Sequence, residues 1–478
     1  MLFTSTVFLL FLLVFVPVYF ALPHRARALW ITAGSYYFYT YGHLEYWWLL
    51  FTCTIVAYLG GLAMARWDAV WQRRLALWLG VGVNVGLLVY FKYGELIVRT
   101  WKTTLKAWHF KSKVHIPHLI LPIGISFFTF QALAYLFDVY RRRFPAERRL
   151  DVFAAYKAFF PQLVAGPIER PGNVIPQLHQ EHRWDFDRTA SGLRLMLWGF
   201  FKKLVIADHL AVAVREAYGS NSSSSLQLIL GTYAFAWQIF CDFSAYTDIA
   251  RGCARILGID LMENFRQPYF AKSIPEFWSR WHISLSTWFR DYLYIPLGGN
   301  RGGWWSWQRN LLIVFLVSGL WHGADWKFAL WGLLHAAFFL GANLFAKIPS
   351  PRTARPRWLQ AGWNGLKIFV TFQLVCVAWV FFRAKSTDHA LQILGRIVHH
   401  PLQGPFFTRS FGLSEFLFTA GAIMLLEAVH LFRERRGSVG AWLDRCPVWV
   451  RWPAYYVVII AIFTLAPAGQ QEFIYFQF

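Results

Sequence analysis

Residues 1–24 read MLFTSTVFLLFLLVFVPVYFALPH and contain no aspartate, glutamate, lysine or arginine. A membrane-spanning helix needs about 20 predominantly apolar residues, so this stretch predicts one such helix. Comparable charge-free stretches follow at residues 46–65, 75–91, 114–137, 217–241, 328–346 and 452–471. Shorter apolar runs at 310–324, 368–382 and 416–426 can also span if flanking side chains reach the interface. The pattern predicts an all-α, polytopic transmembrane bundle of about ten to twelve helices.

The composition excludes an ordinary soluble protein. Hydrophobic residues make up 57% of the 478 residues and charged residues only 15%, whereas soluble domains carry about 25% charged residues. The formal net charge is +22, and the basic residues are spread over short loops. This distribution predicts contacts with anionic lipid headgroups and attraction of an anionic cosubstrate, and it does not favour nucleic-acid binding.

We expect a single membrane domain over residues 1–478. Its motif-dense core covers about 117–346, and plainer helices cover about 365–478. Polar and charged residues interleave with aromatic ones over residues 238–300, where Pro268, Pro275 and Pro296 interrupt helical patterns. Irregular backbone at membrane depth is tolerated only inside protein or beside water. This region therefore predicts short re-entrant or interfacial helices around a polar cavity.

Three histidines lie in or beside that region: His282, His322 and His335. A buried imidazole stays neutral because desolvation lowers its pKa from about 6.5, and a neutral imidazole can take a proton from an alcohol. Asp242 or Asp248 could orient such a histidine, or could instead pair with Arg251, Arg255 or Arg280. No spacing in the sequence predicts a metal site, and no nucleophilic serine or cysteine motif is present.

Two longer motifs carry a resemblance. Residues 263–270 read ENFRQPYF and residues 277–301 read FWSRWHISLSTWFRDYLYIPLGGNR. Together with WHG at 321–323, WGLLH at 331–335, FFPQLVAGPI at 159–168, DFSAYTD at 242–248 and FIYFQF at 473–478, they resemble the membrane-bound O-acyltransferases. The likeness is greatest to the bacterial branch that includes the membrane subunit of alginate O-acetyltransferase.

The resemblance implies a catalytic tunnel near the bilayer centre. His322 would be the catalytic base and His282 a second active-site histidine. The side chains of Asp242, Ser244, Tyr246, Trp321, His335, Arg290 and Asp291 would line the tunnel or bind substrate. The implied donor is acetyl-CoA or an acyl carrier on the cytoplasmic side of a bacterial inner membrane, with no tightly bound cofactor. A periplasmic acetyltransferase partner would then act on an exported polysaccharide such as alginate.

Several alternatives stay open from the sequence. The acyl group could be D-alanyl, and the polymer could be cellulose, peptidoglycan or teichoic acid. A transporter without chemistry is a rival of another class, although the repeats that transporters often show are not evident. Tyr475 is the only hydroxyl-bearing residue in the terminal run FIYFQF. It either anchors the chain at the interface or accepts the acetyl group as a relay.

Overall fold

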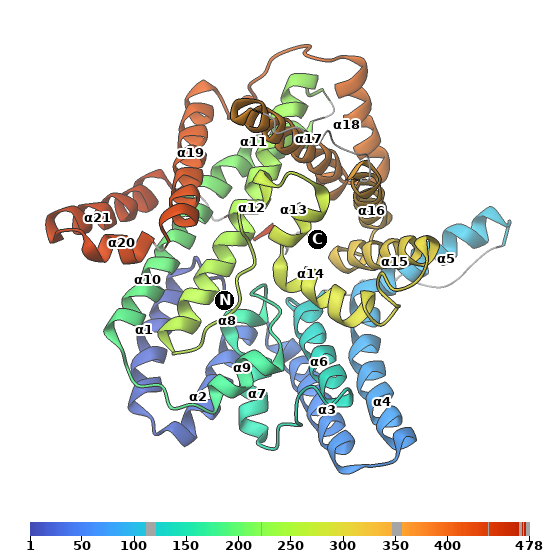
Figure 1. Ribbon diagram of the computed structural model, residues 1–478, viewed down its shortest axis with the longest axis vertical. Coiled ribbons are helices and arrows are strands. Elements are labelled where there is room, and N and C mark those ends of the chain that lie inside the picture. The colour runs from blue at the N-terminus through green and yellow to red at the C-terminus, as the bar shows by residue number, and fades with distance from the viewer. Residues whose placement is uncertain are drawn as a thin grey trace. The chain divides into compact units, whose positions relative to one another are not determined.

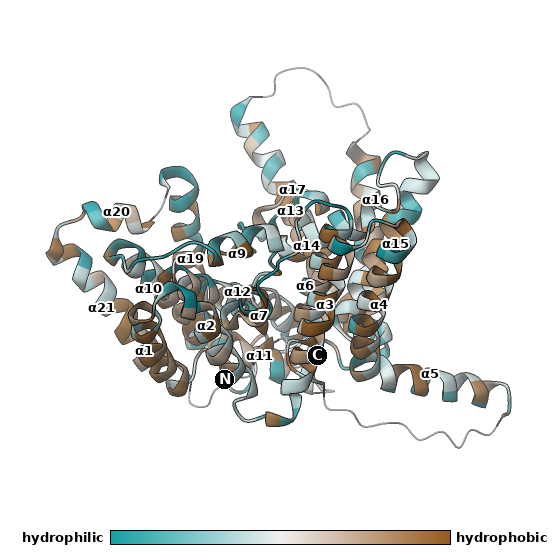
Figure 2. Cartoon of the chain, turned by 90° about the horizontal axis from the view of Figure 1, so that it is seen from below, coloured by the Kyte–Doolittle hydropathy of each residue, from teal (hydrophilic) through white to brown (hydrophobic). Residues whose placement is uncertain are grey.

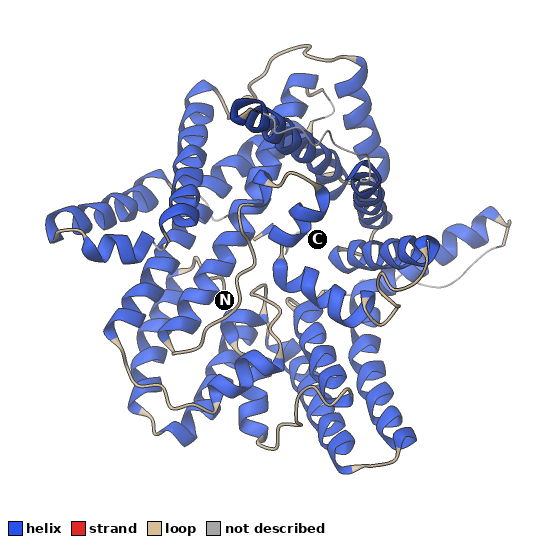
Figure 3. Cartoon of the chain, viewed as in Figure 1, coloured by secondary structure: helices blue, strands red, loops and turns tan. Residues whose placement is uncertain are grey.

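The computed structural model describes residues 1–110, 121–220, 222–346, 356–437, 439–467, 471, 473 and 474. Within these ranges the regular elements are helices, and no strand occurs (Figure 3). The predicted all-α fold is therefore confirmed. Seven helical segments are long and apolar enough to cross a membrane: Leu44–Arg66, Val70–Ala107, Ser225–Ile256, Trp326–Phe345, Arg357–Arg383, Leu413–Arg436 and Val448–Leu465.

The other predicted apolar runs also fall on helices. Thr6–Ala21 and Ile125–Tyr140 are shorter apolar helices, and Trp304–His322 covers most of the run at 310–324. Apolar residues cover most of Thr6–Ala21 and Trp47–Arg66 (Figure 2). The multi-pass architecture is confirmed, and the total of ten to twelve spanning helices stays a prediction.

The chain divides into two compact units. Figure 1 labels most of the helices named below. Unit 1 comprises Met1–Leu195 and Ile249–Met262, and unit 2 comprises Met196–Asp248 and Glu263–Phe478. The helices of unit 1 are α1 (Thr6–Ala21), α2 (His24–Thr40), η1 (Leu44–Tyr46), α3 (Trp47–Arg66), α4 (Val70–Leu88), η2 (Val89–Tyr93), α5 (Gly94–Ala107), α6 (Ile125–Tyr140), α7 (Leu150–Ala158), α8 (Phe160–Leu163), α9 (Pro171–Leu178) and most of α10 (Phe186–Phe200).

Unit 2 contains most of α12 (Ser225–Ile256), whose last residues belong to unit 1. Its other helices are η3 (Phe201–Ala207), α11 (Asp208–Gly219), η4 (Pro268–Phe270), α13 (Ile274–Arg280), α14 (Ile283–Phe289), η5 (Arg290–Tyr294), α15 (Trp304–His322), α16 (Trp326–Ala346), α17 (Arg357–Arg383), α18 (Thr387–His399), α19 (Leu413–Arg436), α20 (Val439–Arg445) and α21 (Val448–Leu465).

An aromatic core holds unit 1 together. The rings of Phe8, Phe11, Phe15 and Phe38 all lie within 6.5 Å of the Phe160 ring, measured between centroids. Ser5 caps α1, since its hydroxyl accepts a hydrogen bond from the Phe8 amide at 3.2 Å. The motif at 159–168 is buried throughout. In this unit the motif therefore has a packing role.

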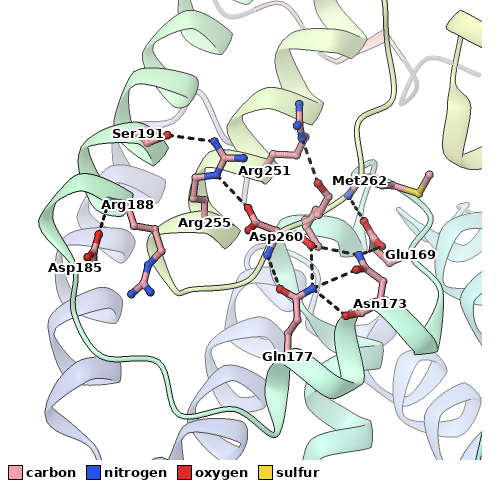
Figure 4. A network of polar contacts seen from close by, with 11 residues as sticks. Glu169, Asn173, Gln177, Asp185, Arg188, Ser191, Arg251, Arg255, Asp260 and Met262 are labelled. Atoms are coloured by element: carbon pink, nitrogen blue, oxygen red, sulfur yellow. Dashed lines mark hydrogen bonds and ion pairs between the residues drawn. The ribbon is translucent and has the colours of Figure 1, made fainter. Parts of the chain in front are cut away.

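A polar network in unit 1 fixes the segment that leaves α12 (Figure 4). The carboxylate of Glu169 accepts hydrogen bonds from the Met262 amide at 2.6 Å and from the Asn173 side chain at 2.7 Å. The side-chain oxygen of Gln177 accepts from the Asp260 amide at 2.8 Å. Burial raises the pKa of Glu169 to about 7. The network sets the path of the chain immediately before the motif that starts at Glu263.

Helix α12 is the interior helix of unit 2. Of the most apolar 18 residues of α12, 83% are buried, whereas only 6% of the most apolar 18 residues of α21 are buried. The prediction of broken helices over 238–300 is wrong for its first part, because α12 continues without interruption to Ile256. The prediction of short helices is correct from Pro268 onward, where η4, α13, α14 and η5 are three to seven residues long.

Glycines let α15 and α16 approach closely. A Cβ atom on Gly319 would lie 2.2 Å from the Phe328 carbonyl oxygen, and one on Gly332 would lie 2.2 Å from the Phe315 carbonyl oxygen. Small residues at helix crossings are the usual means of close packing in membranes. The contact fixes the end of α15 against α16, and that end carries His322.

Candidate active site

The two predicted active-site histidines lie in unit 2 on either side of Trp321. The Trp321 ring centroid is 5.0 Å from that of His322 and 6.1 Å from that of His282. His322 is the last residue of α15 and is 5% exposed, and His282 is fully buried at the start of α14. The structure thus brings together residues that are 40 positions apart in sequence.

The backbone at His282 is held in an unusual conformation. Its φ of 44° lies in the left-handed region, which is uncommon for residues other than glycine. Asn264 stabilises the turn: its carbonyl accepts from the Ile283 amide at 3.0 Å, and its side-chain oxygen accepts from the Ser284 amide at 3.1 Å. These bonds satisfy two of the free amides at the start of α14. Asn264 therefore stabilises the turn from which the His282 side chain projects.

His335 lies in an aromatic cage next to these residues. Its ring is 4.8 Å from Trp331 and 5.0 Å from Trp278, measured between centroids. Trp331 also contacts His322, at 4.9 Å. His335 is fully buried. Trp331 therefore contacts both His335 and the predicted base.

Two buried ion pairs connect η3 with α12 in unit 2. Lys203 contacts Asp242 at 3.0 Å and Asp208 at 2.8 Å. Lys202 contacts Asp248 at 2.7 Å and donates a hydrogen bond to the Ser244 hydroxyl at 2.9 Å. The carboxylates of Asp242 and Asp248 on α12 do pair with cations, here with Lys203 and Lys202. Of the arginines suggested by the sequence, Arg255 pairs with Asp260 and Arg280 with Glu276.

A short stretch near the C-terminus also reaches this site. The Phe473 ring lies 4.6 Å from Tyr246 and 6.0 Å from Phe243, and Phe243 lies 4.7 Å from His282. The amide of Ile474 donates a hydrogen bond to Asp242 at 2.8 Å. Both residues are buried, with exposed fractions of 3% and 0%. Tyr475 follows directly and lies outside the described residues.

The remaining predicted site residues divide into two groups. Asp242, Ser244, Tyr246, Trp321 and His335 are buried in the region just described. Arg290 and Asp291 lie on η5 and pair with each other at 2.8 Å, and the Arg290 side chain is 60% exposed. Among the described residues, no group of histidine, cysteine, aspartate and glutamate side chains has the arrangement of a metal site.

Sequence reasoning missed Lys203, Asp208 and Asn264. Lys203 lies 39 positions before Asp242, and nothing in the sequence pairs these two residues. The turn η3 is a π-helix, and π-helical turns often occur at functional sites. Asn264 belongs to the quoted motif, but its capping role depends on the turn at His282.

The arrangement suits proton transfer away from bulk water. Imidazoles enclosed by aromatic rings stay neutral, since burial disfavours the charged form. The nearby carboxylate charge of Asp242 is compensated by Lys203 and by an amide. Such a site can remove a proton from a hydroxyl group that is brought to the histidines.

Comparisons with known proteins identify the family of the chain. Residues 150–382 match the model of the membrane-bound O-acyltransferase family. A probable alginate O-acetylase of Azotobacter vinelandii is 40% identical over 395 residues, covering 82% of this chain and 76% of the relative. A peptidoglycan O-acetyltransferase of Helicobacter pylori is 35% identical over 429 residues, covering 81% and 79%. A teichoic acid D-alanyltransferase of Bacillus subtilis is 29% identical over 307 residues, covering 59% and 75%.

The range matched by the family model includes Asp242, His282 and His322, and the names of the relatives favour an enzyme over a transporter. The chain therefore belongs to the membrane-bound O-acyltransferase family and is a multi-pass membrane acyltransferase.

Proposed function

We propose that this enzyme passes an acetyl group from cytoplasmic acetyl-CoA through the inner membrane for the O-acetylation of an exported polysaccharide of the alginate type. Two considerations support the acetyl group and the polymer. The relatives from Azotobacter and Helicobacter are named as enzymes that O-acetylate a polymer. Acetyl-CoA carries several phosphate charges and does not cross a bilayer, so only the acetyl group needs to pass.

The distribution of charge in unit 2 supports an orientation. The connector between α16 and α17 contains Lys347, Arg352 and Arg355, and α19 ends in Arg433, Arg435 and Arg436. By the positive-inside rule, the connector between α16 and α17 and the C-terminal end of α19 lie on the cytoplasmic side. The C-terminal ends of α15 and α17, at His322 and Arg383, then lie on the outer side. In this orientation α21 runs outward.

The observation that carries the mechanism is the burial of Phe473 and Ile474 beside Tyr246 and Asp242. The next residue along the chain is Tyr475. We assign to its hydroxyl the role of acyl acceptor, to His322 the role of base, and to His282 an assisting role.

The transfer has two steps. His322 takes the phenolic proton of Tyr475, and the phenolate oxygen attacks the carbonyl carbon of the acetyl thioester. The C–S bond breaks, and the thiolate of CoA leaves with the proton that His322 returns. A polymer hydroxyl, activated by an external acetyltransferase, then attacks the tyrosyl ester and releases Tyr475 with its proton restored. Covalent catalysis of this kind splits a difficult transfer into two easier ones. A bulky polymer need not enter the bilayer.

Tyr475→Phe tests the proposal, because it removes one oxygen and keeps the aromatic ring. The relay predicts that polymer acetylation falls as far as in His322→Ala. If Tyr475 acts only as an interfacial anchor, Tyr475→Phe acetylates polymer at the wild-type level and the relay is wrong. Mass spectrometry of the C-terminal peptide, taken while acceptor is withheld, should show an added acetyl group on Tyr475 in the wild type and none in His322→Ala.

A D-alanyl group is the second candidate, supported by the Bacillus relative, which is named as a D-alanyltransferase. The same peptide distinguishes the two acyl groups by mass. The polymer is identified by comparing ester-linked acyl groups in exopolysaccharide and in cell wall from cells with and without the gene.

A further inference from the structure

One buried carboxylate in unit 2 holds two different partners at once. Asp242 contacts the Lys203 ammonium through Oδ1 at 3.0 Å, and through Oδ2 it accepts a hydrogen bond from the Ile474 amide at 2.8 Å. Lys203 is in turn held by Asp208 at 2.8 Å. The side chains of Asp208, Lys203 and Asp242 are 4%, 8% and 2% exposed. The three residues therefore form a buried unit that faces the C-terminal segment.

Two further contacts hold the same segment. The Phe473 ring is packed on Tyr246 with its plane tilted by 33°. Before it in the chain, the side chain of Gln471 accepts a hydrogen bond from Arg215 at 3.1 Å. The three contacts come from α11 and α12, so two helices determine where Gln471, Phe473 and Ile474 lie.

The contact to Ile474 is made by its backbone amide. Such a hydrogen bond holds the backbone at this point and does not depend on which side chain the residue carries. Moving the segment by one residue would leave a buried carboxylate oxygen without its donor, which costs about 1–3 kcal/mol or more for a charged group. A shift by two residues would offer another amide, so the register is set by this bond together with the packing of the Phe473 ring on Tyr246.

We propose that Asp242, held by Lys203 and Asp208, is a positioning residue that, together with Tyr246, fixes Phe473 and Ile474 in place, as the proposed relay by the next residue requires. This inference rests on the proposed relay for its consequence, but the contact itself can be tested separately. Lys203 and Asp208 act through Asp242. Lys203 pairs with the Asp242 carboxylate, and Asp208 holds Lys203 in place from the other side.

The chain contains a matched control for this cluster. Lys202 precedes Lys203 on η3, is also buried, and pairs with Asp248 at 2.7 Å and with Ser244 at 2.9 Å. Lys202→Met and Lys203→Met remove the same group from neighbouring positions, and each leaves one α12 carboxylate without its lysine. Only Lys203 contacts the carboxylate that accepts from Ile474.

The experiment follows digestion of the C-terminus by a broad-specificity carboxypeptidase, measured by intact mass on purified protein in detergent. In the wild type the buried residues Phe473 and Ile474 should resist removal. In Asp242→Ala and Lys203→Met, digestion should continue past residue 474. Lys202→Met should match the wild type. Asp242→Asn keeps an oxygen that can accept from the amide and should restore most of the protection.

The second measurement is the initial rate at which Tyr475 becomes acetylated. Misplacement of a reacting group by about 1 Å can cost about 10²-fold in rate, and we expect a loss of that size in Asp242→Ala and a smaller one in Asp242→Asn. The KM for acetyl-CoA should stay unchanged, because the donor does not contact this segment in the proposal. A protected C-terminus in folded Asp242→Ala would overturn the positioning role, whatever its activity.

The two proposals fail in different ways. If Tyr475→Phe acetylates polymer normally while Asp242→Ala exposes residue 474, the relay is wrong and the positioning contact stands. If Tyr475→Phe is inactive while Asp242→Ala stays protected, the relay stands and the positioning role is wrong. Exposure of the C-terminus in Lys202→Met to the same extent as in Lys203→Met would also overturn it, because general loosening of η3 would then explain both.

Discussion

His322 is the residue on which the proposed chemistry depends most. It lies at the end of α15 and contacts Trp321, Trp331 and Phe382, with centroid distances of 5.0, 4.9 and 5.3 Å. We expect His322→Ala to lower acetyl transfer by at least about 10²-fold, the usual scale for loss of a general base. Expression and membrane insertion should not change.

The measurement is ester-linked acetate on polymer, normalised to the amount of folded enzyme. His399→Ala, at the exposed end of α18, is the control and should retain wild-type transfer. His282→Ala should cost as much as His322→Ala or less. A folded His322→Ala enzyme with near-normal transfer would exclude the proposed base.

Glu169 predicts a pH dependence of stability in unit 1. Burial raises its pKa from 4.5 to about 7, so the folded protein holds this proton more tightly than the unfolded chain does. Its contribution is fully present below about pH 4.5 and is lost as the pH rises to about 7. Since one pKa unit corresponds to about 1.4 kcal/mol, the loss amounts to about 3 kcal/mol.

Thermal unfolding in detergent between pH 5 and pH 8 measures this effect. The wild-type midpoint should fall as the pH rises, and Glu169→Gln should flatten the profile because it cannot ionise. The exposed Glu181→Gln serves as control and should follow the wild type. Equal slopes for wild type and Glu169→Gln would show that other groups control the profile.

At the scale of elements, the crossing of α15 and α16 depends on Gly319 and Gly332. A side chain at Gly319 has no room, since its Cβ would lie 2.2 Å from a backbone oxygen of α16. We expect Gly319→Val to separate the two helices, to destabilise the protein by about 1–3 kcal/mol or more, and to reduce transfer by moving His322.

Gly341 provides the control for this variant. Gly341 lies on the partner helix α16, and a Cβ atom there would meet no other atom within 4 Å. Gly341→Val should keep stability and transfer close to wild type, as measured by thermal unfolding and by acetate on polymer. Similar losses in the two variants would mean that helix propensity, rather than the crossing, decides the outcome.

The elements also show what the sequence can and cannot predict. The apolar runs predicted the helices, because a membrane requires about 20 apolar residues from each span. Pro268, Pro275 and Pro296 correctly indicated the short helices after η4. The polar residues of α12 were misread as a break, because their lysine partners lie on another helix. The left-handed turn at His282 depends on Asn264 and has no signature of its own.

The candidate site was also predicted only in part, because motifs identify single residues but not the contacts between distant segments. His282, His322 and Trp321 were found through their motifs, and the structure brings them together. The partners of Asp242 were not found, because contacts between distant segments leave no periodic pattern. Arg290 and Asp291 belong to a quoted motif and pair with each other at 2.8 Å, so their predicted role at the tunnel stays a prediction.

For the whole molecule, the net charge of +22 bears on the donor. If acetyl-CoA is the donor, purified protein in detergent should bind CoA, and the affinity should fall as salt rises, because exposed charges are screened beyond about 10 Å at 0.1 M salt. Acetyl-pantetheine keeps the thioester but lacks the nucleotide phosphates, so its binding should not depend on salt. Salt-independent binding of CoA, or no binding, would point to a carrier-protein donor.

The buried ion pairs between η3 and α12 also constrain how the protein is made. The ribosome releases Lys202 and Lys203 before Asp242 and Asp248, and each of these charges alone costs about 2.5–3.5 kcal/mol at the centre of a membrane. Neither helix can therefore enter lipid cheaply by itself. The two helices therefore enter lipid at lower cost as a pair, with their charges already matched.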